Sequence, residues 1–442
     1  MLRLGVHAPT AFDASVGEHG VKGMIGPARS GSTPCLELVG HYVHLDDGYK
    51  VTSGAYPSFS DNWSHTKDYL KTEFRKSTHK GDDQAYKGLL VWIPGSFEGI
   101  KPSFDTAVRR KPLIKALGLY PYSIFWCNSF VQKSMEVLQT LFDSCAEQAG
   151  QDAPHLDDLI ESRLRGVGRA FWRDIEMSAL RSVRGPEELP FEKGERPKLD
   201  PLELGYVGDF AGSLMRLKDE TGCELHLVAE GAGALVVHEM LSALAQDRET
   251  GGKRFGGKQA EDYIDTLHLV HPAIGMPRAQ MGILPLLRAM NRGIDGPKRG
   301  ESEAKEPNVR PLLKHDGDPR GRIYVPTSAL EERVHFGAYG KSILHLVARA
   351  FEDRMPLQEG SHKNAALSDA LNQSLQPPRT LLGMAHAHKD ESFDAFSAVY
   401  RLNRITTEKR DSDRITQGEL NADLTIQNSI FESIKRWREV TR

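Results

Sequence analysis

Hydrophobic residues gather in short runs that are separated by longer amphipathic stretches. Several runs are nearly continuous, as expected of strands that are buried on both faces of a parallel sheet. These runs cover 88–93, 120–126, 225–228, 266–270 and 323–325. The longest helical patterns cover 131–148, 156–182 and 202–217. Strands that alternate with helices predict an α/β fold built on a doubly wound, mostly parallel sheet.

The segments outside these patterns predict the domain organisation. Residues 1–35 are rich in Gly, Ser, Pro and Ala and carry little periodicity, which predicts a flexible N-terminal arm before one domain over 36–442. The helical stretch near 129–200 is long for a crossover between two strands, so we expect a helical, cap-like insertion there. Residues near 291–320 are polar and rich in Gly, Pro and charge, which predicts a mobile loop.

The segment 224–241 is the most informative part of the chain. An apolar run ends there in the small-residue turn Ala-Glu-Gly-Ala-Gly, and a helical pattern follows. A strand, a sharp turn and a helix are the setting of a nucleophile elbow, whose middle residue projects its side chain above the sheet. The middle residue here is Gly231, which has no side chain that attacks a carbonyl. Because glycine adopts left-handed backbone freely, we expect a positive φ at Gly231.

Two other interpretations of this segment exist. The simpler one is a strand, a glycine turn and a helix of the kind found in any α/β protein. The other is a dinucleotide-binding turn, which is disfavoured because Val236 stands where the G-x-G-x-x-G fingerprint has its third glycine.

Three stretches make the chain resemble α/β-hydrolase-fold proteins of the bacterial serine-hydrolase type, over most of residues 85–435. Leu89–Gly99 is similar to the family's strand and oxyanion turn, and His226–Leu241 is similar to its nucleophile elbow. Gly337–Glu352 resembles a helix of the sequence Tyr-Gly-Lys-Ser-Leu in one bacterial branch. The resemblance implies an oxyanion hole made by the backbone N–H groups of Gly95, Ser96 and Ala232.

The resemblance also assigns positions to the catalytic side chains, and these positions hold unsuitable residues. The nucleophile position falls on Gly231, and the position of the acid falls on Ser328, with Glu331 close by as a carboxylate. The position of the base falls on Gln417, in a loop that resembles a Thr-His-Gly loop of the family. Several absences together favour a natural loss of catalysis over a single replacement.

Three further side chains are candidates for acid–base chemistry. His386 and His388 follow an apolar run, and one of them is a candidate for a relocated base. The alternative is that both are surface histidines after an edge strand. Glu230 precedes Gly231, and its carboxylate is a candidate general base on water. The alternative is that hydrogen bonds hold Glu230 on the turn in a structural role.

Composition narrows the class of protein. The chain has 442 residues and a formal net charge of −3, which gives no indication of nucleic-acid binding. Its four cysteines lie far apart without a CxxC pair, and no metal site or cofactor is expected. No apolar run approaches the roughly 20 residues of a membrane span, and no secretory signal is evident. A cytoplasmic protein is therefore expected.

Two functions are consistent with these patterns. The first is a catalytically impaired, esterase-like protein that binds a small acyl, ester or peptide ligand or serves as a partner surface, for a protein partner that the sequence does not specify. The second is an active hydrolase of carboxylic esters or amides. Its serine would have been replaced at Gly231, or its chemistry would use Glu230 with His386 or His388.

Overall fold

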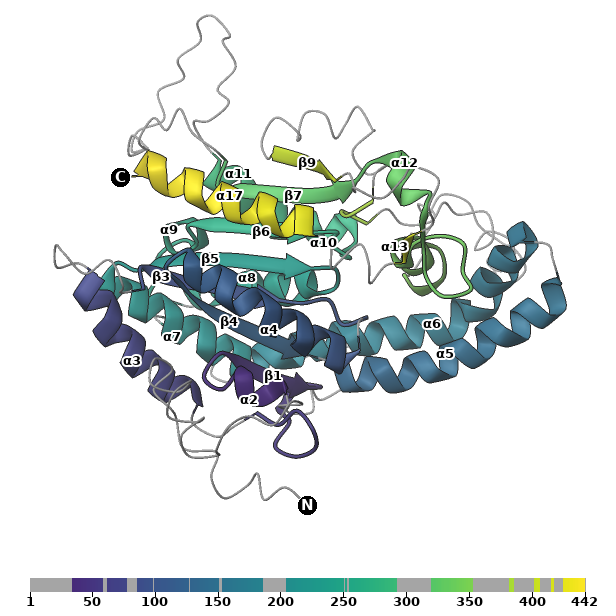
Figure 1. Cartoon of the computed structure of the whole chain (residues 1–442), viewed down its shortest axis with the longest axis horizontal. Coiled ribbons are helices and arrows are strands. Elements are labelled where there is room, and N and C mark those ends of the chain that lie inside the picture. Colours follow the sequence, from purple (N-terminus) through teal and green to yellow (C-terminus); the bar gives the residue numbers. More distant parts are fainter. Residues whose placement is uncertain are drawn as a thin grey trace, which may run out of the picture.

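The fold is built around one eight-stranded sheet, in the order β2-β1-β4-β3-β5-β6-β7-β9. The computed structural model describes residues 34–58, 62–77, 86–97, 99–126, 128–150, 153–185, 204–249, 251–252, 254–291, 319–352, 381–384, 401–405, 415–416 and 424–441. Among the described strands of this sheet, only the β1–β2 hairpin is antiparallel, and all other neighbours are parallel. The expected α/β class and mostly parallel sheet are therefore confirmed (Figure 1).

The strands of the sheet include all five that the hydrophobic runs predict. They are β1 (Tyr42–Asp46), β2 (Tyr49–Lys50), β3 (Gly88–Ile93), β4 (Leu119–Trp126), β5 (Glu224–Glu230), β6 (Thr266–Val270), β7 (Gly321–Pro326) and β9 (Arg401–Ile405). Two further short strands pair with each other outside the sheet: β8 (Val334–His335) and β10 (Ile415–Thr416).

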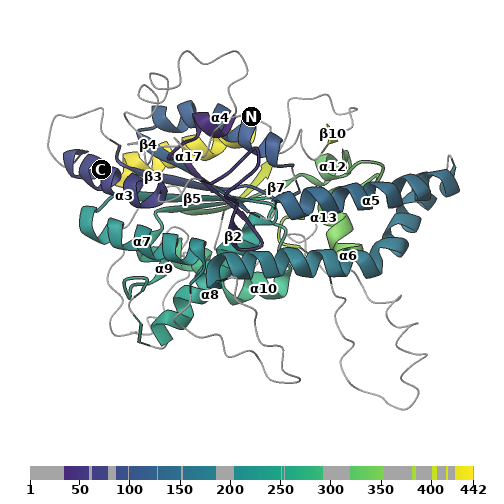
Figure 2. The ribbon, with the colours of Figure 1, turned by 90° about the horizontal axis from the view of Figure 1, so that it is seen from below.

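Helices cover both faces of the sheet (Figures 1 and 2). The long ones are α3 (Asn62–Ser77), α4 (Ile100–Ala116), α5 (Asn128–Ala149), α6 (Ala153–Arg184), α7 (Tyr206–Thr221), α8 (Gly233–Glu249) and α17 (Leu424–Thr441). The short ones are α2 (Pro34–Glu37), α9 (Ala260–Tyr263), α10 (Met276–Met281), α11 (Ile283–Met290), α12 (Ser328–Glu331), α13 (Ile343–Leu346) and the π-helix η1 (Val347–Phe351). Helices α4 and α17 lie on one face, and α7 and α8 lie on the other (Figure 2).

Within the stretch near 129–200, helices α5 and α6 form a hairpin, which we call the cap, and residues 186–200 lie outside the described part of the chain. The cap extends past the carboxyl ends of the strands (Figure 1). The expected arm over 1–35 and the expected loop near 291–320 fall mostly on 1–33 and 292–318, which lie outside the described residues. Pro34–Glu37, at the end of the expected arm, forms the short helix α2.

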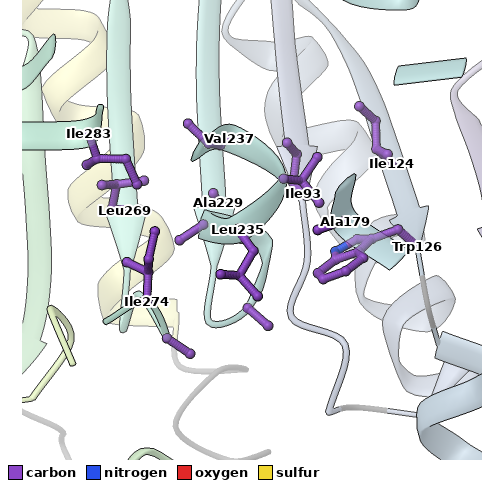
Figure 3. Packing of buried hydrophobic residues seen from close by; sticks show 14 of the residues in the cluster. Ile93, Ile124, Trp126, Ala179, Ala229, Leu235, Val237, Leu269, Ile274 and Ile283 are labelled. Atoms are coloured by element: carbon purple, nitrogen blue, oxygen red, sulfur yellow. The ribbon is translucent and has the colours of Figure 1, made fainter. Parts of the chain in front are cut away.

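Two hydrophobic layers hold the sheet between its helices. On the face of α8, the strand residues Ile93, Ala229 and Leu269 pack with Leu235 and Val237 of the helix (Figure 3). The opposite face carries a separate cluster, in which strand residues pack against α4 and α17. Its members include Leu90, Trp92, Val228, Ile114, Ile430 and Ile434. Both layers are needed because every strand near the centre of the sheet is buried on both sides.

A hydrogen-bonded chain of polar side chains crosses the sheet between β5 and β7. His226 Nε2 lies 3.3 Å from the Glu224 carboxylate, and its Nδ1 lies 2.9 Å from the Thr266 hydroxyl. His268 Nε2 lies 3.0 Å from the same hydroxyl, and its Nδ1 lies 3.0 Å from the Tyr324 hydroxyl. Because a carboxylate only accepts, the donors run in one direction, from Tyr324 through both neutral imidazoles to Glu224. Burial lowers the pKa of His226 and of His268, which favours these neutral forms.

The order of the strands reverses between β3 and β5. The chain passes from β3 to β4 on one side, and then returns to the other side of β3 for β5, β6 and β7. In open α/β sheets, ligands bind outside the carboxyl ends of the strands at such a reversal. The turns that follow Ile93 and Glu230 therefore mark the place where a site is expected.

Buried histidines make the fold sensitive to acid. Burial, together with the charge of Arg278, lowers the pKa of His238 to about 4, whereas the unfolded chain restores a value of about 6.5. Between these two values the unfolded chain binds a proton that the folded chain does not. The free energy of unfolding therefore falls as the pH drops below about 6.5.

We expect the His238→Gln variant to lose this contribution. Urea unfolding between about pH 6 and 5 should show a shallower loss of stability, by up to about 1.4 kcal/mol per pH unit. Equal slopes for the variant and the parent protein would contradict the account.

Candidate functional site

Gly231 lies in a sharp turn between β5 and α8. Its φ of +51° confirms the expected left-handed backbone. Its N–H donates to the carbonyl of Val270 at 2.8 Å, and its own carbonyl accepts from the N–H of Ala273 at 2.9 Å. The turn that follows β6 therefore holds Gly231 by backbone hydrogen bonds on both sides. The expected strand, turn and helix are present, and the central position carries no side chain.

The turn after β3 packs directly against this glycine turn. Trp126 donates from its indole to the carbonyl of Pro94 at 3.2 Å, which fixes the start of the β3 turn. The Cα of Gly95 lies 3.8 Å from the place that a Cβ on Gly231 would occupy, and it is the one described neighbour within 4 Å of that point. Space therefore remains at position 231 where a nucleophile side chain would stand.

Three backbone N–H groups belong to the two turns that pack together after β3 and β5. Those of Gly95, Ser96 and Ala232 have no hydrogen-bond partner within the described part of the chain, and all three residues are buried. The Ser96 hydroxyl is also buried without a partner among these residues. Ala232 immediately precedes α8, whose 17 residues direct the positive end of the helix dipole at the turn. Backbone donors at the N-terminus of a helix are chemically suited to an oxygen atom that carries negative charge.

Glu230 is held in a buried ion pair. Its carboxylate accepts from the Arg110 guanidinium at 2.7 Å, and both side chains are more than nine-tenths buried. The same guanidinium lies 3.8 Å from the centre of the Trp92 ring, in the layer between the sheet and α4. Burial raises the pKa of Glu230, although the charge of Arg110 opposes this effect. This ion pair beneath the turn agrees with the structural role that was the alternative for Glu230.

His271 belongs to the same region, and no sequence motif points to it. It lies in the turn after β6 that holds Gly231, and its φ of +46° is a strained conformation for a residue with a side chain. The imidazole is buried, and its Nε2 has no hydrogen-bond partner in the described structure. Burial lowers the pKa of His271 to about 4, so the ring is neutral at pH 7. No sequence pattern reports φ, so the conformation of His271 could not be predicted.

The positions expected to hold the acid and the base lie apart from the turn or outside the described residues. Ser328 and Glu331 begin and end the short helix α12, which follows β7 and is separated from β5 by β6. Glu331 is buried. His386, His388 and Gln417 lie outside the described residues.

The segment 381–384, which precedes the two histidines in the chain, packs on the turn after β6. Leu382 donates its N–H to the carbonyl of Ile274 at 2.9 Å, and Gly383 donates to that of Pro272 at 2.9 Å. This segment therefore contacts the same turn that holds the elbow glycine.

Aromatic side chains of the cap cover the turn after β3. The ring of Phe97 lies parallel to that of Trp172 with centroids 6.0 Å apart, and meets that of Phe171 edge-on at 6.2 Å. Phe336 adds a further edge contact to Phe97 at 6.4 Å. Since Phe97 follows Ser96 directly, helix α6 stands over the group of unpaired N–H groups.

Comparisons of the chain with protein-family models, with curated proteins and with solved structures give no significant match. None of the described helices has the length and apolar character needed to cross a membrane. Within the described ranges, no three His, Cys, Asp or Glu side chains gather as metal ligands would.

Gly231 and Gly233 are required for different reasons: backbone conformation at position 231 and close packing at position 233. Substitution of each by alanine distinguishes the two. Gly231→Ala should cost about 1–2 kcal/mol, because the left-handed backbone is strained while the added Cβ meets open space. Gly233→Ala should cost more, about 3 kcal/mol or above, because its Cβ would lie 2.5 Å from the carbonyl oxygen of Ile93. Urea unfolding of both variants measures the difference. Equal losses, or a larger loss at position 231, would show that the turns are less tightly packed.

Proposed function

We propose that this protein binds a small ligand through a carboxylate or acyl carbonyl oxygen at the meeting of the two turns, and does not hydrolyse it. One observation carries the proposal: the buried N–H groups of Gly95, Ser96 and Ala232 lack partners in the described structure, beside a glycine that leaves space above the sheet. We further propose that the fold descends from α/β-hydrolases of the esterase or lipase type and has lost its nucleophile.

The energetics favour an anionic or strongly polar oxygen as the occupant. A buried polar group without a partner costs about 1–3 kcal/mol, so three donors that face one place are costly until an acceptor arrives. The dipole of α8 adds a preference for negative charge at its N-terminus. No cation is needed to hold such a ligand, because the backbone donors supply the complementary charge. These features support a carboxylic acid or an acyl group better than a cationic ligand.

The absence of a side chain at Gly231 supports binding without turnover. Covalent catalysis needs a nucleophile that an adjacent base activates. The carboxylate of Glu230 is held by Arg110 beneath the turn, and the imidazole of His271 has no hydroxyl at position 231 to activate. Removing a triad nucleophile costs on the order of 10⁶ in rate.

The alternative is an active hydrolase of esters or amides. One observation favours it: residues 381–384 pack on the turn that holds Gly231, and they precede His386 and His388 in the chain. A histidine from this part of the chain would then supply the base. The proposal and the alternative differ in what a serine at position 231 would do.

Ligand binding is tested by isothermal titration of the full chain with butyrate and benzoate. We expect millimolar or tighter binding to the parent protein and to Gly231→Ala, whose small side chain leaves most of the space open. Gly231→Leu shares the backbone strain of the alanine variant but fills that space, and it should bind at least about tenfold more weakly. No binding to the parent protein, or equal binding to both variants, would contradict the proposal.

A Gly231→Ser variant in the same series separates the proposal from the alternative. A hydroxyl without a base should stay inert to a fluorophosphonate, and the parent protein should not turn over short-chain aryl esters. Rapid stoichiometric labelling of Gly231→Ser would show that a working base exists, and would favour an enzyme disabled at one residue. Substituting His386 or His388 in that variant would then identify the base.

A further inference from the structure

The segment Gly337–Glu352 forms a strap across the inner side of the cap. Its Tyr-Gly-Lys-Ser portion, 339–342, is not helical and precedes the short helix α13 and the π-helix η1. Helix η1 packs along α6, where Phe351 meets the edge of Phe171 at 5.7 Å. A Cβ on Gly168 would overlap the Phe351 ring, so glycine is needed for this close approach. The segment that resembles a bacterial helix motif therefore packs closely on α6.

Charged side chains fasten the strap to α6. Asp157 and Glu161 lie one helical turn apart on α6, and both are at least nine-tenths buried. Glu161 accepts from the Tyr339 hydroxyl at 2.7 Å and from Lys341 at 3.0 Å. It also pairs with Arg349 at 3.3 Å.

The second carboxylate of the pair, that of Asp157, also contacts the strap. Asp157 accepts from the backbone N–H of Gly340 at 2.7 Å, and its other oxygen lies 3.7 Å from Lys341. Two carboxylates thus meet two cations, a phenol and an amide.

The Glu161 carboxylate of this cluster is charged at neutral pH. Burial raises the pKa of Glu161, but the hydrogen bonds from Tyr339 and Lys341 and the charge of Arg349 outweigh it, so the pKa lies below its ordinary value. Glu161 is therefore ionised at pH 7, and it would lose its charge only as the pH falls through that lowered value. Lys341 and Arg349 are 32% and 40% exposed, so water and salt reach the outer side of the cluster.

We propose that Asp157 and Glu161 of α6, with Tyr339, Lys341 and Arg349 of the strap, form an ionic latch that holds the cap closed over the elbow turn. Opening this latch admits the ligand. The inference rests on the proposed function for the identity of the site, and it concerns the control of access to that site. Helix α6 of the cap contacts Phe97, which lies in the turn after β3. Displacement of the cap would therefore uncover the unpaired N–H groups of that turn.

An ionic latch differs from apolar packing in how readily it releases. Its charged groups regain hydration when they separate, which lowers the cost of breaking the latch, whereas the apolar contacts of α6 with Phe97 and Phe351 oppose displacement of the cap. Partly exposed ion pairs also weaken as salt screens their attraction. The latch is therefore expected to set a balance between closed and open forms of the cap.

The latch is tested without any ligand, with a thiol at position 231 as the reporter. Gly231→Cys in the full chain is exposed to a thiol reagent, and modification of the peptide that contains residue 231 is followed by mass spectrometry. Adding Glu161→Gln should raise the rate about tenfold, because Gln keeps the shape but loses the charge-assisted hydrogen bonds. Raising the salt concentration should increase the rate in the parent reporter, and much less in the Glu161→Gln reporter.

Two controls separate opening of the cap from loss of the fold. Asp158→Asn removes an exposed carboxylate beside the latch and should leave the rate within about twofold. Cys223, buried at the start of β5, should stay protected throughout. If Glu161→Gln folds poorly, Lys341→Gln provides the second variant, with the same expected direction.

Equal modification rates for Glu161→Gln and Asp158→Asn would overturn the latch while leaving the proposed ligand site untouched. A joint rise at Cys223 and at position 231 would also overturn it, because the cluster would then support the whole fold. Conversely, a failure of butyrate and benzoate to bind would remove the proposed ligand and leave the modification rates unchanged.

Discussion

The close approach of two turns at the carboxyl ends of β3 and β5 is the constraint on which the site depends. Helix α8 can begin where it does only because Gly233 brings no Cβ against the carbonyl of Ile93. Gly95 and Gly231 meet above that contact with no side chain between them. As a consequence, backbone N–H groups line the place where the turns meet. The same absence of side chains that allows tight packing provides the donors of the proposed site.

The elbow turn is fixed from two directions at once. The turn after β6 holds Gly231 through its N–H and its carbonyl, and in doing so carries His271 in a strained conformation. Beneath the sheet, the buried pair of Glu230 and Arg110 holds the last residue of β5. Breaking one partner of such a pair costs about 3–5 kcal/mol, because the remaining charge is left buried. A rigid turn is what preorganised binding of one oxygen atom requires.

The sequence specified the strands well, and it specified the roles of polar residues poorly. The strands 88–93 and 266–270 were predicted with their observed bounds, because burial on both faces leaves an uninterrupted apolar run. The partner of Glu230 could not be predicted, because Arg110 lies 120 residues earlier and only the fold brings the two together. The φ of Gly231 followed from the pattern of small residues, whereas the φ of His271 has no signature in sequence. The acid and base positions rest on a resemblance between loops, which defines a residue less securely than hydrophobic periodicity does.

The most direct test of a ligand site made of backbone donors is a crystal structure of the protein with a small carboxylate such as benzoate. The account predicts a carboxylate oxygen within about 3.0 Å of the N–H groups of Gly95 and Ala232, with no covalent bond to the chain. Helix α6 and Phe97 should lie over the bound molecule or be displaced to admit it. A carboxylate bound elsewhere, with these N–H groups paired to other parts of the protein, would contradict the central claim.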